Sequence, residues 1–302
     1  MTLNRRNLFR IAGAAGAATV AGRALSSAMT PGAPKTTANA VLVDTTRCVG
    51  CRACEAACSE ANQLAEPEKP GDAAVFASRR RTGPTSFTVV NKSTEKSPNG
   101  EDRYAKMQCM HCVSPACASG CVVGALEKTP AGPVVYHAGQ CIGCRYCMIA
   151  CPFSVPKYEY AKAAPLVKKC TFCAERQGQG LPPACTEACP SGALLFGKRA
   201  DLLEEARTRI YQNPTRYTHE IYGEDEAGGT SWLYLSDVPF TSLALPGEIE
   251  KRSYPELAEG ALSAVPLVAT LWPPLLMGLY TFSKRRHDVA EEGNGRKGDG
   301  HE

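Results

Sequence analysis

Sixteen cysteines are the residues of this 302-residue chain whose type and spacing most clearly indicate chemistry. All of them lie between positions 48 and 189, in four groups of four. Groups I and III share the spacing C-x2-C-x2-C-x3-C, whereas group II is C-x2-C-x4-C-x3-C and group IV is C-x2-C-x11-C-x3-C. In chain order the groups are Cys48, Cys51, Cys54 and Cys58; Cys109, Cys112, Cys117 and Cys121; Cys141, Cys144, Cys147 and Cys151; and Cys170, Cys173, Cys185 and Cys189.

These compact spacings are typical of iron–sulfur ligation. Group III, followed directly by Pro152, has the full spacing of the bacterial ferredoxins. Three thiolates at x2 intervals on a tight loop can hold three corners of one cubane, and a helix carries the fourth thiolate to a neighbouring cluster. The proline suits the first turn of a helix just beyond. Because each group supplies four thiols, the sequence predicts four 4Fe–4S clusters with all sixteen cysteines as ligands.

Three other uses of the cysteines compete with this interpretation. Structural zinc sites typically combine two distant C-x2-C pairs, which the compact three-plus-one runs do not resemble. Disulfides are possible in an exported protein, but Cys48, Cys51 and Cys54 crowd one short loop and make poor partners for one another. Smaller clusters of the 2Fe–2S or 3Fe–4S type could occupy one site, although four cysteines per group favour 4Fe–4S throughout.

Residues outside the cysteine groups indicate no catalysis. The sequence contains no nucleophile–base pair, phosphate-binding glycine loop or paired carboxylates at recognisable spacing. His111 and His137 could tune or ligate a group, but they are more simply interpreted as surface or loop residues. We therefore expect no catalytic residues and a non-catalytic electron-transfer subunit. A standalone redox enzyme is the alternative from another class.

The charge distribution argues against a nucleic-acid partner. Residues 1–28 carry four arginines and no acidic residue, so the remainder has 30 basic and 30 acidic side chains. A neutral body offers no electrostatic footprint for nucleic acid. The 22 prolines and 27 glycines indicate a loop-rich fold.

The first 28 residues are expected to be an export signal. Arg5 and Arg6 resemble the arginine pair of twin-arginine signals, although Asn4 stands where Ser or Thr is usual. Small residues at Ser26 and Ala28 suit cleavage after residue 28. A weakly amphipathic basic helix is the alternative.

The other end of the chain predicts a membrane anchor. Residues 260–283 contain no charge, and as a helix they would extend about 36 Å, enough for a hydrocarbon core of about 30 Å. Residues 284–286 are basic, which indicates a cytoplasmic tail over 284–302 and a body on the periplasmic face of the inner membrane. Prolines within the span suggest packing against another membrane protein. A buried core helix is the alternative.

The complete pattern of four groups resembles the four-cluster ferredoxin-like electron-transfer subunits of membrane-bound respiratory oxidoreductases, over about residues 40–240. The segments 221–230 and 233–240 are similar to two subfamilies: the HybA-type subunit of quinone-linked periplasmic nickel–iron hydrogenases and the beta subunit of respiratory formate dehydrogenases. A signal and a span on one chain look most like the HybA type.

This resemblance implies a catalytic hydrogenase partner, or alternatively a formate dehydrogenase or another molybdopterin enzyme, and an integral membrane subunit that reduces quinone. It also implies nested ligand sets, which we call the first to fourth sets. They are Cys48, Cys51, Cys54 and Cys189; Cys170, Cys173, Cys185 and Cys58; Cys109, Cys112, Cys117 and Cys151; and Cys141, Cys144, Cys147 and Cys121.

The expected fold class is α+β: a duplicated, loop-rich bacterial-ferredoxin-like fold with four 4Fe–4S clusters and one C-terminal transmembrane helix. The ferredoxin-like domain is expected over 40–215 and a C-terminal extension over 216–259. Local patterns predict a hairpin over 125–136, strands at 86–90 and 103–107, and an amphipathic helix over 201–211.

Overall fold

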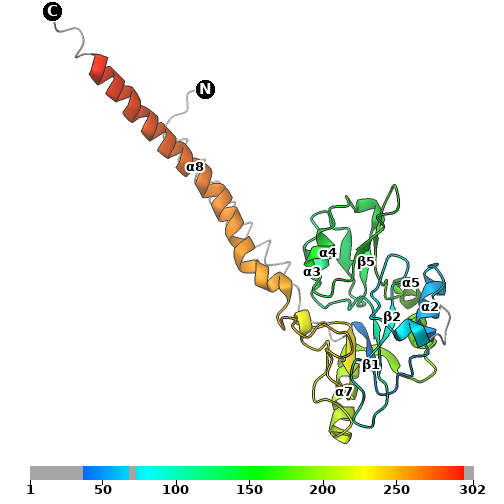
Figure 1. Ribbon diagram of the computed structural model, residues 1–302. Coiled ribbons are helices and arrows are strands. Elements are labelled where there is room, and N and C mark those ends of the chain that lie inside the picture. Colours follow the sequence, from blue (N-terminus) through cyan, green and yellow to red (C-terminus); the bar gives the residue numbers. More distant parts are fainter. Residues whose placement is uncertain (1–36, 68–72, 296–302) are drawn as a thin grey trace, which may run out of the picture.

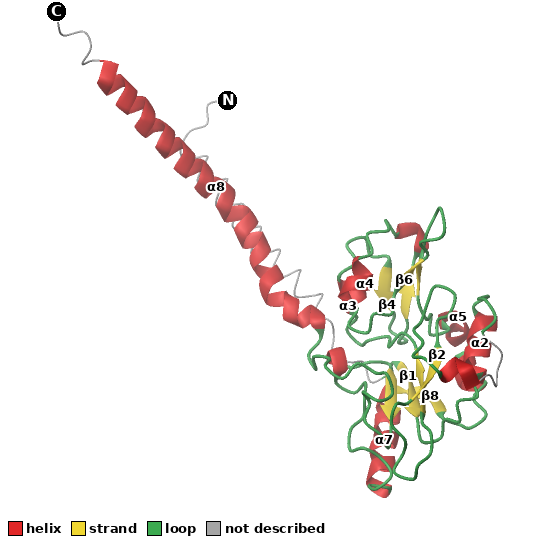
Figure 2. Cartoon of the chain, in the orientation of Figure 1, coloured by secondary structure: helices red, strands yellow, loops and turns green. Residues whose placement is uncertain are grey.

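The computed structural model describes residues 37–67 and 73–295. The body is loop-rich and contains both helices and strands, and one long helix leaves it at the C-terminal end (Figures 1 and 2). The expected signal at 1–28 and the end of the expected tail, 296–302, lie outside the described residues.

A three-stranded sheet of order β8-β1-β9 forms the centre of the body. Strand β1 (Asn39–Asp44) pairs antiparallel with β8 (Leu194–Lys198) and parallel with β9 (Trp232–Leu235). Side chains alternate between the two faces of a strand, so the apolar run of β1 supplies both faces with core residues. Strand β9 lies within the segment 216–259 and is fully buried, so this part of the chain completes the central sheet.

Helix α7 (Arg199–Gln212) covers one face of this sheet (Figure 1). Leu202 and Ala206 are four residues apart, on one side of the helix, and both pack in a buried cluster with Leu42 and Leu233. The helix predicted over 201–211 is therefore confirmed, with two more residues at its start and one at its end.

The opposite face of the sheet is directed toward the cysteines. Val41, Val43, Trp232 and Tyr234 pack there in one buried cluster that also contains Cys54 and Cys185. The central sheet therefore packs against two of the cysteine groups, I and IV, and helps to position them.

Three antiparallel hairpins surround the cysteine loops. They are β2 (Val89–Lys92) with β3 (Tyr104–Met107), β4 (Leu126–Lys128) with β5 (Val134–Tyr136), and β6 (Lys157–Tyr158) with β7 (Val167–Lys168). Strand β3 confirms the strand predicted at 103–107, and β4 with β5 confirms the hairpin predicted over 125–136, whereas β2 begins three residues later than the strand predicted at 86–90 and ends two residues later.

Short helices carry most of the remaining regular structure. The α-helices are α2 (Ala53–Ala61), α3 (Ala116–Ser119), α4 (Tyr146–Ala150), α5 (Ala174–Gly178) and α6 (Ala184–Glu187). The 3-10 helices are η2 (Ala73–Phe76), η3 (Ala138–Gln140) and η4 (Glu226–Gly228).

The placement of the prolines after the cysteine groups differs from our expectation. Pro152 and Pro190 lie in turns that follow α4 and α6, and neither begins a new helix. Proline is common just after a helix end because it cannot continue the helix. Each proline thus prevents the preceding cysteine-bearing helix, α4 or α6, from continuing.

Helix α8 (Tyr254–Gly295) stands away from the body (Figure 2). The helix over residues 254–290 is long and apolar enough to cross a membrane, and its most apolar 18-residue stretch has a mean hydropathy of 1.6 and is not buried. The helix continues through Pro266, Pro273 and Pro274, and the hydroxyl of Thr270 donates to the carbonyl of Pro266 at 2.8 Å. It is longer than the predicted span of 260–283 at both ends.

Candidate iron–sulfur cluster sites

Groups I and III have the same loop conformation. Gly50 and Gly143 follow the first cysteine of each group by two positions and both have positive φ, at 69° and 71°. A Cβ on Gly50 would lie 2.8 Å from the ring of Tyr104, and one on Gly143 would lie 2.7 Å from the hydroxyl of Tyr158. Only glycine meets both demands, so the tight turn that gathers three cysteines depends on it.

The third cysteine of groups I and III sits in the helix that follows the loop. The residue before each helix is an arginine in the left-handed conformation, Arg52 before α2 and Arg145 before α4. Cys54 then lies in the first turn of α2, and Cys147 in the first turn of α4. The helix therefore begins before the third cysteine, earlier than we expected.

Groups II and IV share a second local pattern. His111 and Phe172 occupy the same position in each group, directly before the second cysteine, and both have positive φ. The third cysteine of each group, Cys117 or Cys185, lies in a four-residue helix whose preceding residue is proline. Groups I and III are thus alike in backbone and in spacing, whereas groups II and IV share a backbone pattern although their middle spacings differ, x4 against x11.

The thiols of the first set converge on one cavity. Cys48, Cys51, Cys54 and Cys189 line this cavity together with Lys106 and residues of the central sheet. Cys48 also interacts electrostatically with Cys189 and Cys51. A cysteine from the end of group IV therefore lies beside group I, although 131 positions separate Cys189 from Cys58.

The thiols of the other three sets are also close enough to interact electrostatically with one another. Cys58 interacts electrostatically with Cys185 and Cys173. In the third set, Cys112 interacts with Cys109, Cys151 and Cys117. In the fourth set, Cys147 interacts with Cys141, Cys121 and Cys144.

Consecutive sets are neighbours in space. Cys54 of the first set interacts with Cys185 of the second. Cys170 of the second set interacts with Cys109 of the third. Cys117 of the third set interacts with Cys147 of the fourth. The four sets therefore follow one another in a row through the body, from the first to the fourth.

The donor atoms fit clusters better than the alternatives. All sixteen cysteines are free thiols. Within residues 37–67 and 73–295, no three His, Cys, Asp or Glu side chains close around a point that would hold one metal ion. Zinc would need its sulfur ligands at about 2.3 Å from one centre. The four thiols of the first set line one cavity, an arrangement that suits a cluster shared by all four.

The thiols are shifted toward their protonated form by burial. Burial raises the pKa of Cys48 and of Cys151 to about 11, and that of Cys58 and of Cys117 to about 12. Lys106 lowers the pKa of Cys58, and Lys169 lowers that of Cys117, but neither lysine offsets burial. Bound iron supplies further positive charge and deprotonates a coordinating thiol outright.

Backbone amides around the thiols can tune the clusters. Ala125 N donates to Cys121 Sγ at 3.2 Å, and Phe172 N donates to Cys170 Sγ at 3.3 Å. Gly143 N donates to Cys141 Sγ at 3.4 Å. Hydrogen bonds to sulfur are one of the means by which a protein sets a cluster's reduction potential.

Sequence reasoning missed several buried polar residues beside the thiols. His111 lies in a loop, which agrees with one part of its interpretation, but it is fully buried and not at the surface. Its Nδ1 accepts a hydrogen bond from Val134 N at 2.9 Å. Lys106 and Lys169 are also buried, and Lys128 Nζ donates to the carbonyl of His111 at 2.8 Å. The available signal for Lys106 was its position within a predicted strand, because a lysine is almost never fully buried unless its charge is paired.

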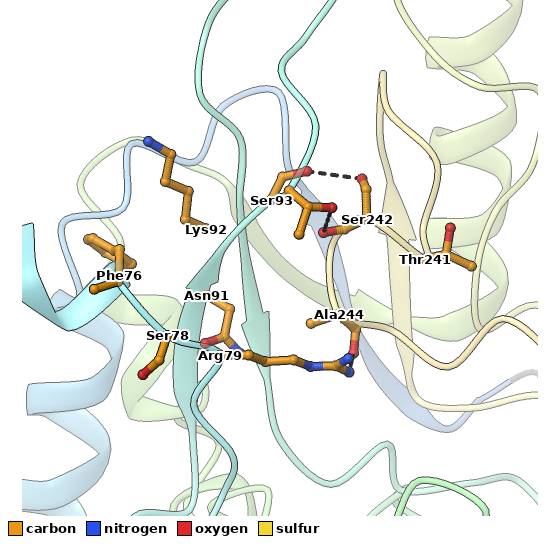
Figure 3. Close-up of a pocket in the computed structure, with 11 residues that line it drawn as sticks. Phe76, Ser78, Arg79, Asn91, Lys92, Ser93, Thr241, Ser242 and Ala244 are labelled. Carbon is orange, nitrogen blue, oxygen red and sulfur yellow. Dashed lines mark hydrogen bonds between the residues drawn. The ribbon is translucent and has the colours of Figure 1, made fainter.

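A separate pocket lies away from the thiols (Figure 3). Its lining contains no cysteine and comes in part from β2 and from the loop around residue 242. The hydroxyls of Ser93 and Ser242 are bonded to each other across it at 2.9 Å. These polar groups satisfy one another, and their hydrogen bond joins the C-terminal segment to the hairpin.

Comparisons with known proteins agree with this geometry. Residues 101–199 match the model of the 4Fe-4S dicluster domain family, which spans groups II to IV. A protein of Nitratidesulfovibrio vulgaris is 47% identical, over 96% of this chain and 80% of that protein. The hydrogenase-2 operon protein HybA of Escherichia coli O157:H7 is 37% identical, over 81% of this chain and 84% of that protein.

The iron–sulfur subunit of the nitrate-inducible formate dehydrogenase of Escherichia coli K12 is 35% identical, over 80% of this chain and 82% of that subunit. The resemblance stated from the cysteine pattern is therefore confirmed. The chain belongs to the family of 4Fe–4S electron-transfer subunits of respiratory oxidoreductases that includes HybA and the formate dehydrogenase iron–sulfur subunits.

Proposed function

We propose that this chain conducts electrons from a periplasmic nickel–iron hydrogenase to a quinone-reducing membrane subunit. Four 4Fe–4S clusters, held by the four nested sets, would supply the one-electron carriers. The observation that carries the proposal is the row of thiols, in which Cys54 interacts electrostatically with Cys185, Cys170 with Cys109, and Cys117 with Cys147. A row of redox sites without a catalytic constellation suits conduction.

The two ends of the row suggest its direction. The fourth set lies by α3 and α4, and α3 contacts α8, whereas α2, with ligands of the first two sets, lies on the far side of the body (Figure 1). Ile142 and Ile149 beside the fourth set are 66% and 81% exposed. An exposed apolar surface next to a candidate membrane helix suits a membrane partner. Electrons would therefore enter at the first set and leave from the fourth.

The remaining parts of the proposal concern location. Residues 1–28 would act as a twin-arginine signal, 260–283 as the span and 284–302 as a cytoplasmic tail. The anchored body, residues 40–259, would then face the periplasm. In the part of the chain that the structure describes, one helix, at residues 254–290, is long and apolar enough to span a membrane, and it supports the anchor. The basic residues 284–286 support the orientation of the tail.

Deletion of the chain tests the function. Membranes that lack it should lose hydrogen-driven quinone reduction and keep hydrogen oxidation with an artificial dye, because the catalytic site is on another subunit. Unchanged quinone reduction would refute the proposal. The similarity to a formate dehydrogenase subunit supports a second candidate partner. Loss of formate-driven instead of hydrogen-driven quinone reduction would assign the chain to that complex.

A further inference from the structure

Lys106 is a buried cation held in a rigid cage of polar and aromatic side chains. It lies on β3, and the residue is 2% exposed. Its Nζ donates to Gln108 Oε1 at 2.9 Å and lies 4.3 Å from the centre of the Trp232 ring. Tyr234 closes the cage, because its hydroxyl accepts from Gln108 Nε2 and donates to the carbonyl of Lys106, each at 2.8 Å.

Among the residues that the structure describes, no carboxylate pairs with this ammonium group. An unpaired buried charge costs several kcal/mol, so Lys106 needs another source of negative charge. The groups that interact electrostatically with this ammonium group are four cysteines of the ligand sets, Cys185, Cys54, Cys170 and Cys58.

These four cysteines show which ligand sets lie close to the ammonium group of Lys106. Cys54 belongs to the first set, and the other three belong to the second. Lys106 also lines the cavity of the first set, together with all four of its thiols. Lys106 is therefore close to both the first set and the second set and interacts with cysteines of each.

We propose that Lys106 is a fixed positive charge that raises the reduction potentials of the first two clusters together. This inference rests on the proposed function, because it needs clusters in both sets. Reduction adds one negative charge to a cluster, and a nearby buried cation stabilises the reduced form more than the oxidised form. Weak dielectric screening in the interior makes this preference much larger than it would be for a surface lysine.

The consequence concerns the entry side of the electron path. A pair of clusters with raised potentials accepts electrons readily from a catalytic partner and holds them until the next carrier is oxidised. The Trp232 ring and Gln108 keep the cation in place, so the two potentials rise together. Lys106 tunes the carriers without binding a substrate.

The test is a redox titration of the anaerobically purified full-length protein, followed by electron paramagnetic resonance. Lys106→Met removes the charge and keeps an unbranched side chain, whereas Lys106→Arg keeps the charge. Lys106→Gln is the alternative if the Met variant assembles poorly. Lys92→Met is the matched control, because Lys92 lies on the paired strand β2 and its side chain is 38% exposed.

In the Met variant, we expect the reduction equilibrium constants of two of the four clusters to fall at least tenfold. For a one-electron couple, this lowers the reduction potential by at least about 59 mV. The other two should stay unchanged, and the Arg and Lys92→Met variants should match the wild type. Four unchanged potentials in a fully loaded Met or Gln variant would overturn the inference, as would an equal shift of all four. Iron and sulfide analysis separates the two hypotheses, because a wild-type protein without clusters would refute the proposed function itself.

Discussion

The imidazole ring of His111 lies stacked on the ring of Phe172, with the ring centres 5.0 Å apart and the planes inclined by 25°. The two residues occupy the same position in groups II and IV, and their φ values are 46° and 55°. Their contact joins the loop of the third set to the loop of the second. Two loops of like conformation thus meet through their equivalent side chains.

The hydrogen bond of His111 leads to the first prediction. His111→Phe keeps an aromatic ring at a backbone conformation that Phe172 already adopts, but it removes the acceptor for Val134 N–H. A buried donor left without a partner costs about 1–3 kcal/mol. We expect a lower denaturant midpoint, measured anaerobically from the loss of cluster absorbance. His137→Phe is the control, since His137 is 46% exposed and should shift the midpoint little. Equal midpoints for the two variants would contradict the role assigned to His111.

The second prediction concerns Glu55, a buried residue that lies between the two cysteines of α2 in the sequence. Arg52 Nη2 and Arg80 Nη1 both donate to Glu55 Oε2 at 3.1 Å. Glu55→Gln removes the negative charge that compensates both guanidinium groups, and breaking a buried pair in this way costs about 3–5 kcal/mol. Clusters of the first two sets should be lost faster in the presence of an iron chelator.

The matched control for this variant is Asp102→Asn. It breaks the pair between Lys92 and Asp102, in which both side chains are about one-third exposed. Such pairs contribute about 0–1 kcal/mol. The chelator should therefore act on this variant as on the wild type, and similar rates for both variants would rule out the buried network as a support of α2.

The sequence predicted those features that depend on residues close together in the chain. The hairpin at 125–136 follows from its turn residues, and α7 follows from Leu202 and Ala206 on one face. The pairing of β1 with β9 joins residues about 190 positions apart, and no local pattern specifies it. Lys106 was missed for a related reason, because its environment is assembled from β9 and two distant cysteine groups.

The third prediction tests the nested ligand sets. Cys58 interacts with Cys185 and Cys173 across the space between α2 and group IV. Cys58→Ser should therefore alter the electron paramagnetic resonance signal of the cluster in the second set and leave that of the first set unchanged. Cys48→Ser is the matched comparison and should have the opposite effect. If Cys58→Ser and Cys48→Ser changed the same signal, the crossover between groups I and IV would be wrong.

The fourth prediction concerns the C-terminal helix as a tether. Deletion of residues 260–302 should leave a cluster-loaded protein that still supports hydrogen oxidation with an artificial dye, because no cysteine lies beyond Cys189. Quinone reduction should fall sharply, since the span keeps the fourth set close to the membrane subunit at high effective concentration.

A span replaced by leucines over 260–283 separates tethering from docking. Pro266, Pro273 and Pro274 leave helix carbonyls without their usual backbone donors, and in a membrane a neighbouring helix is one source of replacement partners. A leucine span anchors the body but cannot reproduce that packing, so it should restore quinone reduction only in part. Full restoration would limit α8 to anchoring. Full quinone reduction by the truncated protein would show that the body docks without any tether.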